Sequence, residues 1–396
     1  MENNSSQTNV RHQMLFHGKG GEYFSIWLVN LLLTGITLGI YSAWATVRRR
    51  RYFYGNTELN GDRFDYHAQP IEILKGRLLV LVGVIIFYVL LFVAPLAGVV
   101  ALLIFVGLIP WFIIRNWRYN AIMSSYRGVR FNYQCKTGRA YWALLFCPML
   151  LILGLYAVII VLGVIGSNAE SIGGVITLAI GSIVVLVPLF AVINGVIATL
   201  QHDLYVNNLH FGNSPFSAEL KKAAYIKFAL FSLLIFVPFF VIAMLLAGSF
   251  FATLFQFALM GGMSDEMAAT LLISHAFSLF LMVLVILVGA MISSSYHMVA
   301  QRNYLFKQTT LKGEVKLNSS MQTLPYMGLL ITNSLITVFS LGFAAPVAEV
   351  RHARYMAQST QVEGDLSLLT VQAHHETANN AIAEEVVQAL DLGASF

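Results

Sequence analysis

Long runs of apolar residues, separated by short polar segments, dominate the pattern of this chain. A helix needs about 20 predominantly apolar residues to cross the hydrocarbon layer of a bilayer. Six runs meet this length clearly, whereas two further runs, 23–47 and 326–350, are ambiguous. The pattern therefore predicts six long membrane spans, at residues 73–94, 96–114, 143–166, 173–200, 225–251 and 268–300.

The six long runs form three pairs, because the two members of each pair are joined by a connection without Lys or Arg. These connections lie at residues 94–96, 167–170 and 261–266. All 24 basic residues lie in the other loops, the adjoining helix ends and the termini. Cytoplasmic loops are enriched in Lys and Arg. We therefore predict that the three connections face outward and that every basic loop faces the cytoplasm.

An internal repeat relates the beginning of the chain to its end. Residues 30–62 share many identities with the segment 303 positions later, without a gap. The matching positions include Asn30 and Asn333, Thr34 and Thr337, Gly39 and Gly342, Arg51 and Arg354, and Gly61 and Gly364.

Four tyrosines each stand nine residues before a glycine, and polar and apolar residues alternate around these glycines. Such alternation around Xaa-Gly is typical of a β-hairpin, in which glycine suits the positive φ of the turn. The pairs are Tyr52 with Gly61, Tyr119 with Gly128, Tyr304 with Gly313 and Tyr355 with Gly364. A fifth copy near residues 207–211 lacks the glycine at the matching place. The sequence predicts five units, each a helical segment that ends in a cytoplasmic hairpin.

The first and last units are too short to cross the membrane twice. Each offers about 30 apolar residues, whereas crossing out and back takes about 40. Gly39 and Gly342 provide matching breaks. The predicted fold is therefore an all-α polytopic membrane protein with three pairs of long spans, two terminal bent or re-entrant helical segments and short cytoplasmic β-hairpins. Eight simple spans are the alternative.

The repeat also suggests a division of the chain into three parts. Residues 1–22 form a polar cytoplasmic N-terminus, residues 23–364 the repeat-built membrane domain, and residues 365–396 an acidic tail. Apolar residues recur at helical spacing in the tail, which suits an amphipathic helix as well as a disordered segment.

Composition agrees with a membrane protein and gives no sign of catalysis. The chain is 58% hydrophobic and 11% charged, compared with about 45–50% and about 25% in soluble proteins. Its two cysteines, Cys135 and Cys147, are not in a CxxC pattern, and no metalloprotease, hydrolase or phosphate-loop motif occurs. We expect no enzyme activity, no cofactor and no metal site.

Polar residues within the two terminal segments are the candidate solute path. They are Asn30, Thr34, Thr37, Asn333 and Thr337. Asn and Thr at matching positions suit the binding of a solute inside the helix bundle. The alternative is that they form hydrogen bonds between helices, which contribute about 0.6 kcal/mol each in a membrane.

The run Arg48, Arg49, Arg50 and Arg51 follows an apolar helix and is the candidate contact with anionic lipid. Basic clusters beside a membrane attract anionic headgroups by about 1 kcal/mol per charge. The alternative is a topology anchor. Membrane lipids are the expected partners, and nucleic acid is not, because the basic loops are short and flank spans. The sequence identifies no protein partner and no oligomeric state.

Three segments resemble the YjgN family of bacterial inner-membrane proteins, whose function is unknown. They are FHGKGGEYFSIWLVN at 16–30, TLGIYSAWATVRRRRYFYGNTELNGDRFDY at 37–66 and ILKGRLL at 73–79. The resemblance implies a multi-pass protein of the bacterial inner membrane and brings no site residues. The repeats and breaks favour a transporter or channel for a small solute, ion or lipid. A non-catalytic scaffold, which binds lipid or a partner through its hairpin layer, is the alternative.

Overall fold

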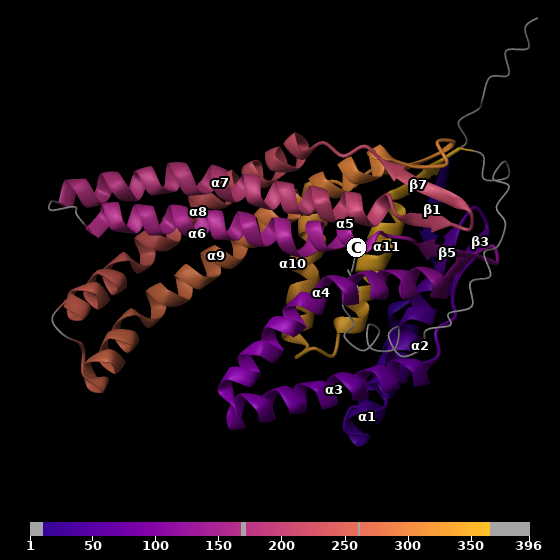
Figure 1. Cartoon of the computed structure of the whole chain (residues 1–396), viewed down its shortest axis with the longest axis horizontal. Coiled ribbons are helices and arrows are strands. Elements are labelled where there is room, and N and C mark those ends of the chain that lie inside the picture. The colour runs from indigo at the N-terminus through magenta and orange to yellow at the C-terminus, as the bar shows by residue number, and fades with distance from the viewer. Residues whose placement is uncertain (1–10, 168–171, 260–261, 365–396) are drawn as a thin grey trace, which may run out of the picture.

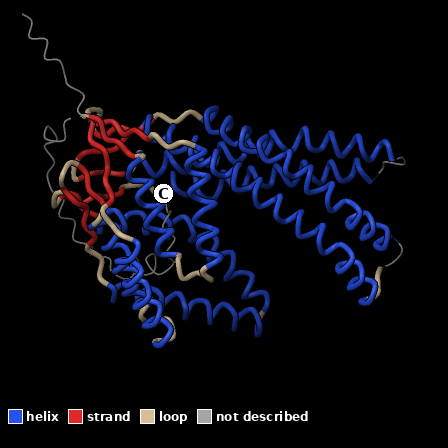
Figure 2. Tube along the Cα trace, turned by 180° about the vertical axis from the view of Figure 1, so that it is seen from behind, coloured by secondary structure: helices blue, strands red, loops and turns tan. Residues whose placement is uncertain are grey.

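The computed structural model describes residues 11–167, 172–259 and 262–364. The chain is mostly helical, but ten short strands gather at one end of the molecule, as Figure 1 and Figure 2 show. The strands form one closed barrel in the order β1-β10-β9-β8-β7-β6-β5-β4-β3-β2. The prediction of an all-α fold is therefore wrong, because the strands close into one sheet instead of remaining separate elements.

All neighbouring strands of the barrel are antiparallel. Its closure joins the two ends of the described chain, since Arg11 of β1 pairs with Glu363 of β10. Residues 11–16, within the segment interpreted as a polar N-terminus, thus form a barrel strand. The strands are β1 (Arg11–Phe16), β2 (Thr57–Leu59), β3 (Asp62–Tyr66), β4 (Ser124–Tyr126), β5 (Val129–Tyr133), β6 (Leu209–Phe211), β7 (Ser214–Ala218), β8 (Thr309–Leu311), β9 (Val315–Ser319) and β10 (Thr360–Glu363).

Apolar side chains fill the interior of the barrel. Every strand contributes at least one of them, in keeping with the alternation of side chains along a strand. These side chains pack together and make the barrel a hydrophobic core. The side chains are Met14, Leu59, Phe64, Tyr126, Phe131, Phe211, Phe216, Leu311, Val315, Leu317 and Val362.

Five helical excursions leave the barrel after one strand and return at the neighbouring strand. We call them the five helix pairs. Neighbouring pairs touch around the ring, and α11 of the last pair packs against α1 of the first. The pairs are α1 (Gly20–Ile36) with α2 (Ser42–Gly55), α3 (Pro70–Val93) with α4 (Pro95–Met123), α5 (Thr137–Tyr141), η1 (Trp142–Phe146) and α6 (Cys147–Ser167) with α7 (Ile172–Val206), α8 (Lys222–Leu259) with α9 (Asp265–Gln308), and α10 (Thr323–Phe339) with α11 (Ala345–Gln358).

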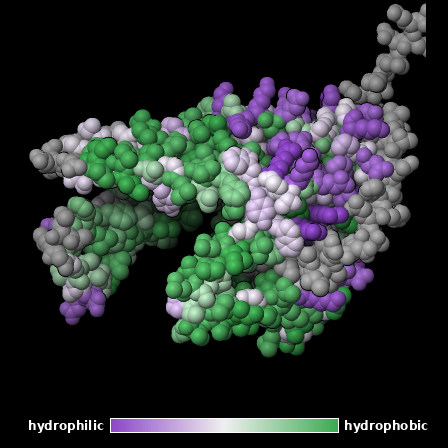
Figure 3. All heavy atoms as spheres, viewed as in Figure 1, coloured by the Kyte–Doolittle hydropathy of each residue, from purple (hydrophilic) through white to green (hydrophobic). Residues whose placement is uncertain are grey.

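Within the described part of the chain, six helices are long and apolar enough to cross a membrane. They cover the six predicted spans, and most continue further toward the barrel than the apolar runs indicate. Figure 3 shows hydrophobic side chains over these helices and hydrophilic ones gathered at the barrel end. The apolar surface is thus separated from the charged end, as an integral membrane protein requires.

The first and last helix pairs are shorter than the others. Each consists of helices of 17 and 14 residues separated by a break. At about 1.5 Å per residue, 17 residues extend about 26 Å, less than the hydrocarbon thickness of about 30 Å. Both ends of each short pair continue into neighbouring strands of the barrel. These segments are therefore bent, and eight simple spans do not describe them.

Matching backbone geometry produces the two breaks. Leu38 and Gly39 have φ of 50° and 93°, and Leu341 and Gly342 have φ of 51° and 89°. Residues in this left-handed region end a helix, and the amide of Gly39 donates to the carbonyl of Thr34 at 2.8 Å. The tips are apolar and open, with Leu38 95% and Leu341 88% exposed. Both tips are thus suited to lie in lipid.

Three of the four repeated tyrosines clamp the two ends of their own helix pairs through backbone groups, whereas Tyr119 donates to the side chain of Glu72 in α3 at 3.0 Å. The hydroxyl of Tyr52 accepts from the amide of Lys19 at 2.8 Å and donates to the carbonyl of Lys19 at 3.0 Å. Tyr355 contacts Gln322 in the same way, at 3.3 and 3.1 Å. Tyr304 accepts from the amide of Lys221 at 3.0 Å. The fixed spacing between tyrosine and glycine thus places the tyrosine hydroxyl where it can bond to the start of its own helix pair.

The residue before each of these tyrosines connects to the next helix pair. Arg51 donates to the carbonyl of Ala68 at 3.1 Å, and Asn303 donates to that of Met321 at 2.9 Å. Arg354 of the last pair donates to the carbonyl of Gly18, before the first pair, at 2.9 Å. This type of hydrogen bond therefore also joins the last helix pair to the first and closes the ring of five helix pairs.

The glycines of the repeat have positive φ, as predicted. The values are 86° for Gly61, 74° for Gly128, 74° for Gly313 and 133° for Gly364. The hairpin predicted at Gly364 is not found in the described residues, because β10 pairs with β9 and with β1 from the other end of the chain. In the degenerate copy, β6 and β7 pair across residues 212–213. There the glycine is Gly212, with φ of 56°. The glycine has moved one position earlier in the turn, which is why the fixed spacing misses it.

Candidate functional site

Two adjoining cavities lie along one face of α11, at the point where the short helix pairs meet the barrel. The smaller holds about 380 Å³ and the larger about 490 Å³. Phe53, His352 and Ala353 line both of them. Residues spaced three and four apart share one face of a helix, so α11 presents Glu349, its two shared residues and then Met356 to this space. We call the two cavities together the α11 groove.

The smaller cavity, which we call the upper part of the groove, is lined by polar side chains whose opposite charges are paired. Arg49 of α2 forms an ion pair with Glu349 at 3.2 Å, and the hydroxyl of Tyr23 donates to Glu349 at 3.1 Å. Burial and then the negative charge of Glu349 raise the pKa of Tyr23, so this hydroxyl stays protonated. These contacts join the first and last helix pairs.

The lower part of the groove, next to the barrel, contains a cation among apolar side chains. Arg302 of α9 donates to the hydroxyl of Thr360 at 2.8 Å, and its guanidinium lies 4.5 Å from the ring centre of Phe306. Burial and then the charge of Arg302 lower the pKa of His352, which keeps its imidazole neutral near neutral pH. Met14, Phe53, Tyr54, Phe64, Met298 and Met356 line most of the remaining wall.

The candidate solute-path residues lie in two separate helix pairs. Asn30 is buried in α1, and Asn333 lies in α10, where its amide nitrogen donates to the carbonyl of Ala348 at 3.1 Å. The carboxamide oxygens of both have no partner among the described residues. Only Asn333 lines the α11 groove.

The threonines of the candidate path hold the helix breaks. Thr37 donates its hydroxyl to the carbonyl of Leu33 at 2.7 Å and accepts from the amide of Tyr41 at 2.9 Å. Thr34 and Thr337 contribute backbone carbonyls to the bonds from Gly39 and Gly342, both at 2.8 Å. These contacts favour a structural role for the three threonines.

The four consecutive arginines point to different surroundings. Arg49 pairs with Glu349, and Arg50 donates to the hydroxyl of Tyr66 at 2.7 Å. Arg51 donates to the carbonyl of Tyr66 in β3 and to that of Ala68, just before α3. Arg48 is exposed and lines a shallow cavity of about 660 Å³ together with Ile26 and Val29. The geometry leaves Arg48 as the member most open to a lipid headgroup.

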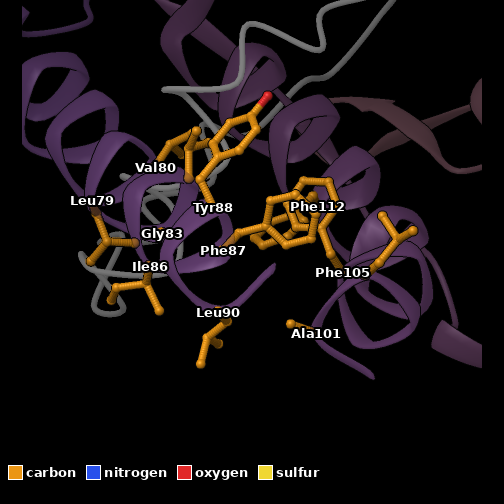
Figure 4. A pocket seen from close by; sticks show the side chains of 12 residues that line it. Leu79, Val80, Gly83, Ile86, Phe87, Tyr88, Leu90, Ala101, Phe105 and Phe112 are labelled. Carbon is orange, nitrogen blue, oxygen red and sulfur yellow. The ribbon is translucent and has the colours of Figure 1, made fainter. Parts of the chain in front are cut away.

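A fourth cavity, of about 450 Å³, lies between α3 and α4 (Figure 4). Leu79, Gly83, Phe87 and Ala101 are among its lining residues, and Tyr88 carries the one hydroxyl drawn there. Its walls are apolar and lie on helices that suit the hydrocarbon layer. It can accommodate an acyl chain but contains no group that would select a headgroup.

Arg302 and His352 are the groove residues that sequence reasoning missed. One signal was available for the first of them, because Arg302 stands two residues before Tyr304, as Arg50 stands before Tyr52. Nothing local in the sequence brings His352 beside Arg302, since they lie on helices of different pairs. In the described ranges no three His, Cys, Asp or Glu residues gather in a way that would hold a metal ion.

Comparison with known proteins agrees with the membrane architecture. A family profile described as bacterial protein of unknown function (DUF898) matches residues 11–389. Inner membrane protein YjgN of Salmonella typhimurium is 30% identical over 379 residues, which cover 95% of each chain. The protein of the same name from Escherichia coli O157:H7 is 30% identical over 380 residues, covering 90% of this chain and 89% of the relative. No solved structure matches the chain.

Proposed function

Because the chain belongs to the bacterial family of unknown function DUF898 and is a multi-pass protein of the inner membrane, we propose that it transports an amphiphilic solute. The solute enters the α11 groove sideways from the bilayer. The basic residues lie at the barrel end and its adjoining loops, so the barrel faces the cytoplasm. The groove then lies near the cytoplasmic leaflet.

The short terminal pairs carry this proposal. Three helix pairs are long enough to cross the membrane, whereas α1–α2 and α10–α11 are not. Figure 3 shows a hollow between the lobe that contains α3 and α4 and the lobe that contains α8 and α9. In Figure 1, α10 and α11 lie between these lobes near the barrel. Lipid fills this hollow in a membrane and reaches the apolar tips at Leu38 and Leu341.

The groove has the size and lining of a site for an amphiphile. Ligand cavities commonly measure about 300–1,000 Å³ and combine apolar walls with few polar groups. The two cavities of about 380 and 490 Å³ contain Arg49, Glu349 and Arg302 beside aromatic and methionine side chains. Met suits sites that accept flexible apolar chains.

The barrel argues against two other functions. Its interior is filled by apolar side chains, which does not favour an ion channel along its axis. Its ten strands close on themselves, so no free edge is available for a partner to extend the sheet. A scaffold that docks partners by edge pairing therefore has less support than a transporter.

The proposal is tested by transbilayer movement of a fluorescent phospholipid in proteoliposomes. Wild-type protein should move the probe faster than protein-free vesicles. Ala353→Trp fills the shared wall of both cavities and should slow movement at least about tenfold, since an indole removes the space that the solute needs. Gln358→Trp places the same side chain on the exposed face of α11 and should change the rate less than about twofold.

The thermal unfolding temperatures of both variants are measured beside the rates. Equal rates for wild-type and protein-free vesicles, with phosphatidylglycerol and with phosphatidylcholine probes, would overturn transport of a phospholipid-like solute. Equal slowing by the two tryptophans would show that the groove is not the route.

A further inference from the structure

We infer that the larger cavity of the α11 groove binds the oxyanion headgroup of an amphiphile, with Arg302 as the residue that contacts it. The inference rests on the proposed function and names the class of its solute. Arg302 is brought there by the last turns of α9, opposite His352 and Met356 of α11 and above the side chains of Met14 and Phe64 in the barrel.

The guanidinium of Arg302 has donors to spare. One nitrogen, Nη2, donates to Thr360 at 2.8 Å. Nε is buried and has no hydrogen-bond partner among the described residues. The face of the group lies against Phe306, which fixes the plane of its remaining donors. A planar group with free N–H donors matches the paired oxygens of a carboxylate or a phosphate.

The charge of Arg302 has no counterion among the residues that the structure describes. Among residues 11–167, 172–259 and 262–364, no Asp or Glu forms an ion pair with it within 4.0 Å. Arg49, in the upper part of the groove, has Glu349. Arg302 is partly buried, and a charge withdrawn from water is costly unless it is paired. An anion in the larger cavity would remove that cost.

The apolar side chains that line the rest of the larger cavity favour a ligand with an apolar chain attached to its anionic headgroup. Met14, Phe53, Phe64, Met298 and Met356 surround the cavity, and its volume of about 490 Å³ exceeds what one headgroup fills. A single cation without a second charged partner suits one oxyanion. Phosphodiester lipids and fatty acids share this chemistry, and inorganic phosphate has the charge without the apolar body.

The test measures binding to the purified full-length protein in a neutral detergent. The probes are phosphatidylglycerol, phosphatidylcholine, oleate and inorganic phosphate, each added separately, with thermal shift and fluorescence titration as readouts. Arg302→Gln should weaken binding of the anionic lipid by about 10- to 100-fold, because a hydrogen-bonded charge pair is lost. Lys307→Gln removes the same charge from the exposed last turn of α9 and should change binding less than about twofold.

Without lipid, Arg302→Gln should unfold at a higher temperature than wild type, because it removes an unpaired buried charge. Added anionic lipid should then stabilise wild type and not the variant. Preference for phosphatidylglycerol over oleate identifies a phosphate head, and the reverse order a carboxylate head. Phosphatidylcholine carries the same phosphodiester beside a compensating cation, so its binding separates the effect of the oxyanion from that of net charge. Binding that does not differ between the four probes, or inorganic phosphate as the best probe, would overturn an oxyanion-bearing amphiphile as the ligand.

The two proposals fail separately. If Arg302→Gln binds anionic lipid as tightly as wild type, the headgroup site is wrong, while movement of the probe in proteoliposomes still supports transport. If wild type moves no probe but binds anionic lipid in an Arg302-dependent way, transport is wrong and the headgroup site stands.

Discussion

Single hydroxyls hold the ends of the helix pairs together. Tyr52, Tyr304 and Tyr355 each contact a backbone amide just before the first helix of their own pair. The tyrosine hydroxyl and the backbone amide thereby both have a hydrogen-bond partner where the chain leaves the barrel. The tyrosine is needed for its hydroxyl as well as its ring, because phenylalanine would leave the backbone groups of Lys19 without these bonds.

Tyr52→Phe should lower the free energy of unfolding by about 1–2 kcal/mol, as expected for the loss of two hydrogen bonds. Thermal or denaturant unfolding of the detergent-solubilised protein measures the change. Tyr156→Phe is the matched control, because Tyr156 is 58% exposed on a long apolar helix and should shift stability by less than about 0.5 kcal/mol. Equal losses would contradict the clamp.

His352 links the proposed headgroup site to pH. Its ring faces Arg302 from α9 and Tyr326 from α10, the latter at 6.1 Å between ring centres, while Arg49 and Glu349 line the adjoining cavity. Burial and the charge of Arg302 lower the pKa of His352. A bound anion offsets that charge and raises this pKa again, so protonated His352 and the anion favour each other.

Binding of phosphatidylglycerol should therefore strengthen as pH falls from about 7 to about 5, through the range in which histidine titrates. Titrations of wild type and His352→Gln at several pH values measure this dependence. The variant should bind with little change over the same range. Affinity of wild type that stays constant or falls toward low pH would refute the link.

At the scale of elements, close approach of helices depends on small residues. Gly195 of α7 lies against α8, where an added Cβ would stand 2.5 Å from the backbone nitrogen of Ile226. The backbone of α8 cannot move aside to make room for the added atom, whereas the end of a flexible side chain could. Gly181 of the same helix has no atom within 4 Å of an added Cβ, so the two glycines form a natural pair for comparison.

Gly195→Ala should reduce the yield of folded protein and lower its unfolding temperature, because α7 and α8 must separate. Gly181→Ala should be neutral or raise stability slightly, since alanine is favoured over glycine in a helix by about 1 kcal/mol. Gel filtration in detergent and thermal unfolding measure both. Equal behaviour of the two variants would show that the contact is unimportant.

At the scale of the whole molecule, the barrel collects the charged end of every helix pair. It joins residues from both ends of the described chain, and the ion pair between Arg11 and Glu363 at 3.1 Å accompanies the pairing of β1 with β10. The long helices extend away from it on one side (Figure 2). We therefore expect the barrel and the far connections to face opposite sides of the membrane.

Cysteine labelling tests this orientation in intact cells, in a background with Cys135 and Cys147 replaced. Glu266→Cys, at the start of α9 far from the barrel, should react with an impermeant maleimide added outside, once the outer membrane is opened. Lys316→Cys, on the barrel strand β9, should react only after the inner membrane is permeabilised. Both positions are exposed. The opposite labelling pattern would reverse the orientation and move the groove to the other leaflet.

Features that depend on local pattern could be predicted from the amino-acid sequence. Long apolar runs identify six helices that suit a membrane, because hydrocarbon thickness sets a minimum length. Glycine positions identify the breaks at Gly39 and Gly342 and the turns at Gly61, Gly128 and Gly313, because only certain residues tolerate positive φ. The predictions for residues 1–10 and for the acidic tail at 365–396 concern segments outside the described residues.

The tertiary structure alone decided which distant segments meet. Four of the ten strands have only three residues and β10 has four, which is too few to show a convincing alternation of polar and apolar residues. In addition, β1 pairs with β10 about 350 positions later in the chain. Asn30 and Asn333 match in sequence but lie in different helix pairs. Within the described ranges Arg302 lacks a counterion, which no spacing along the chain reveals, because the electrostatic balance of a partly buried charge depends on every element that surrounds it in space.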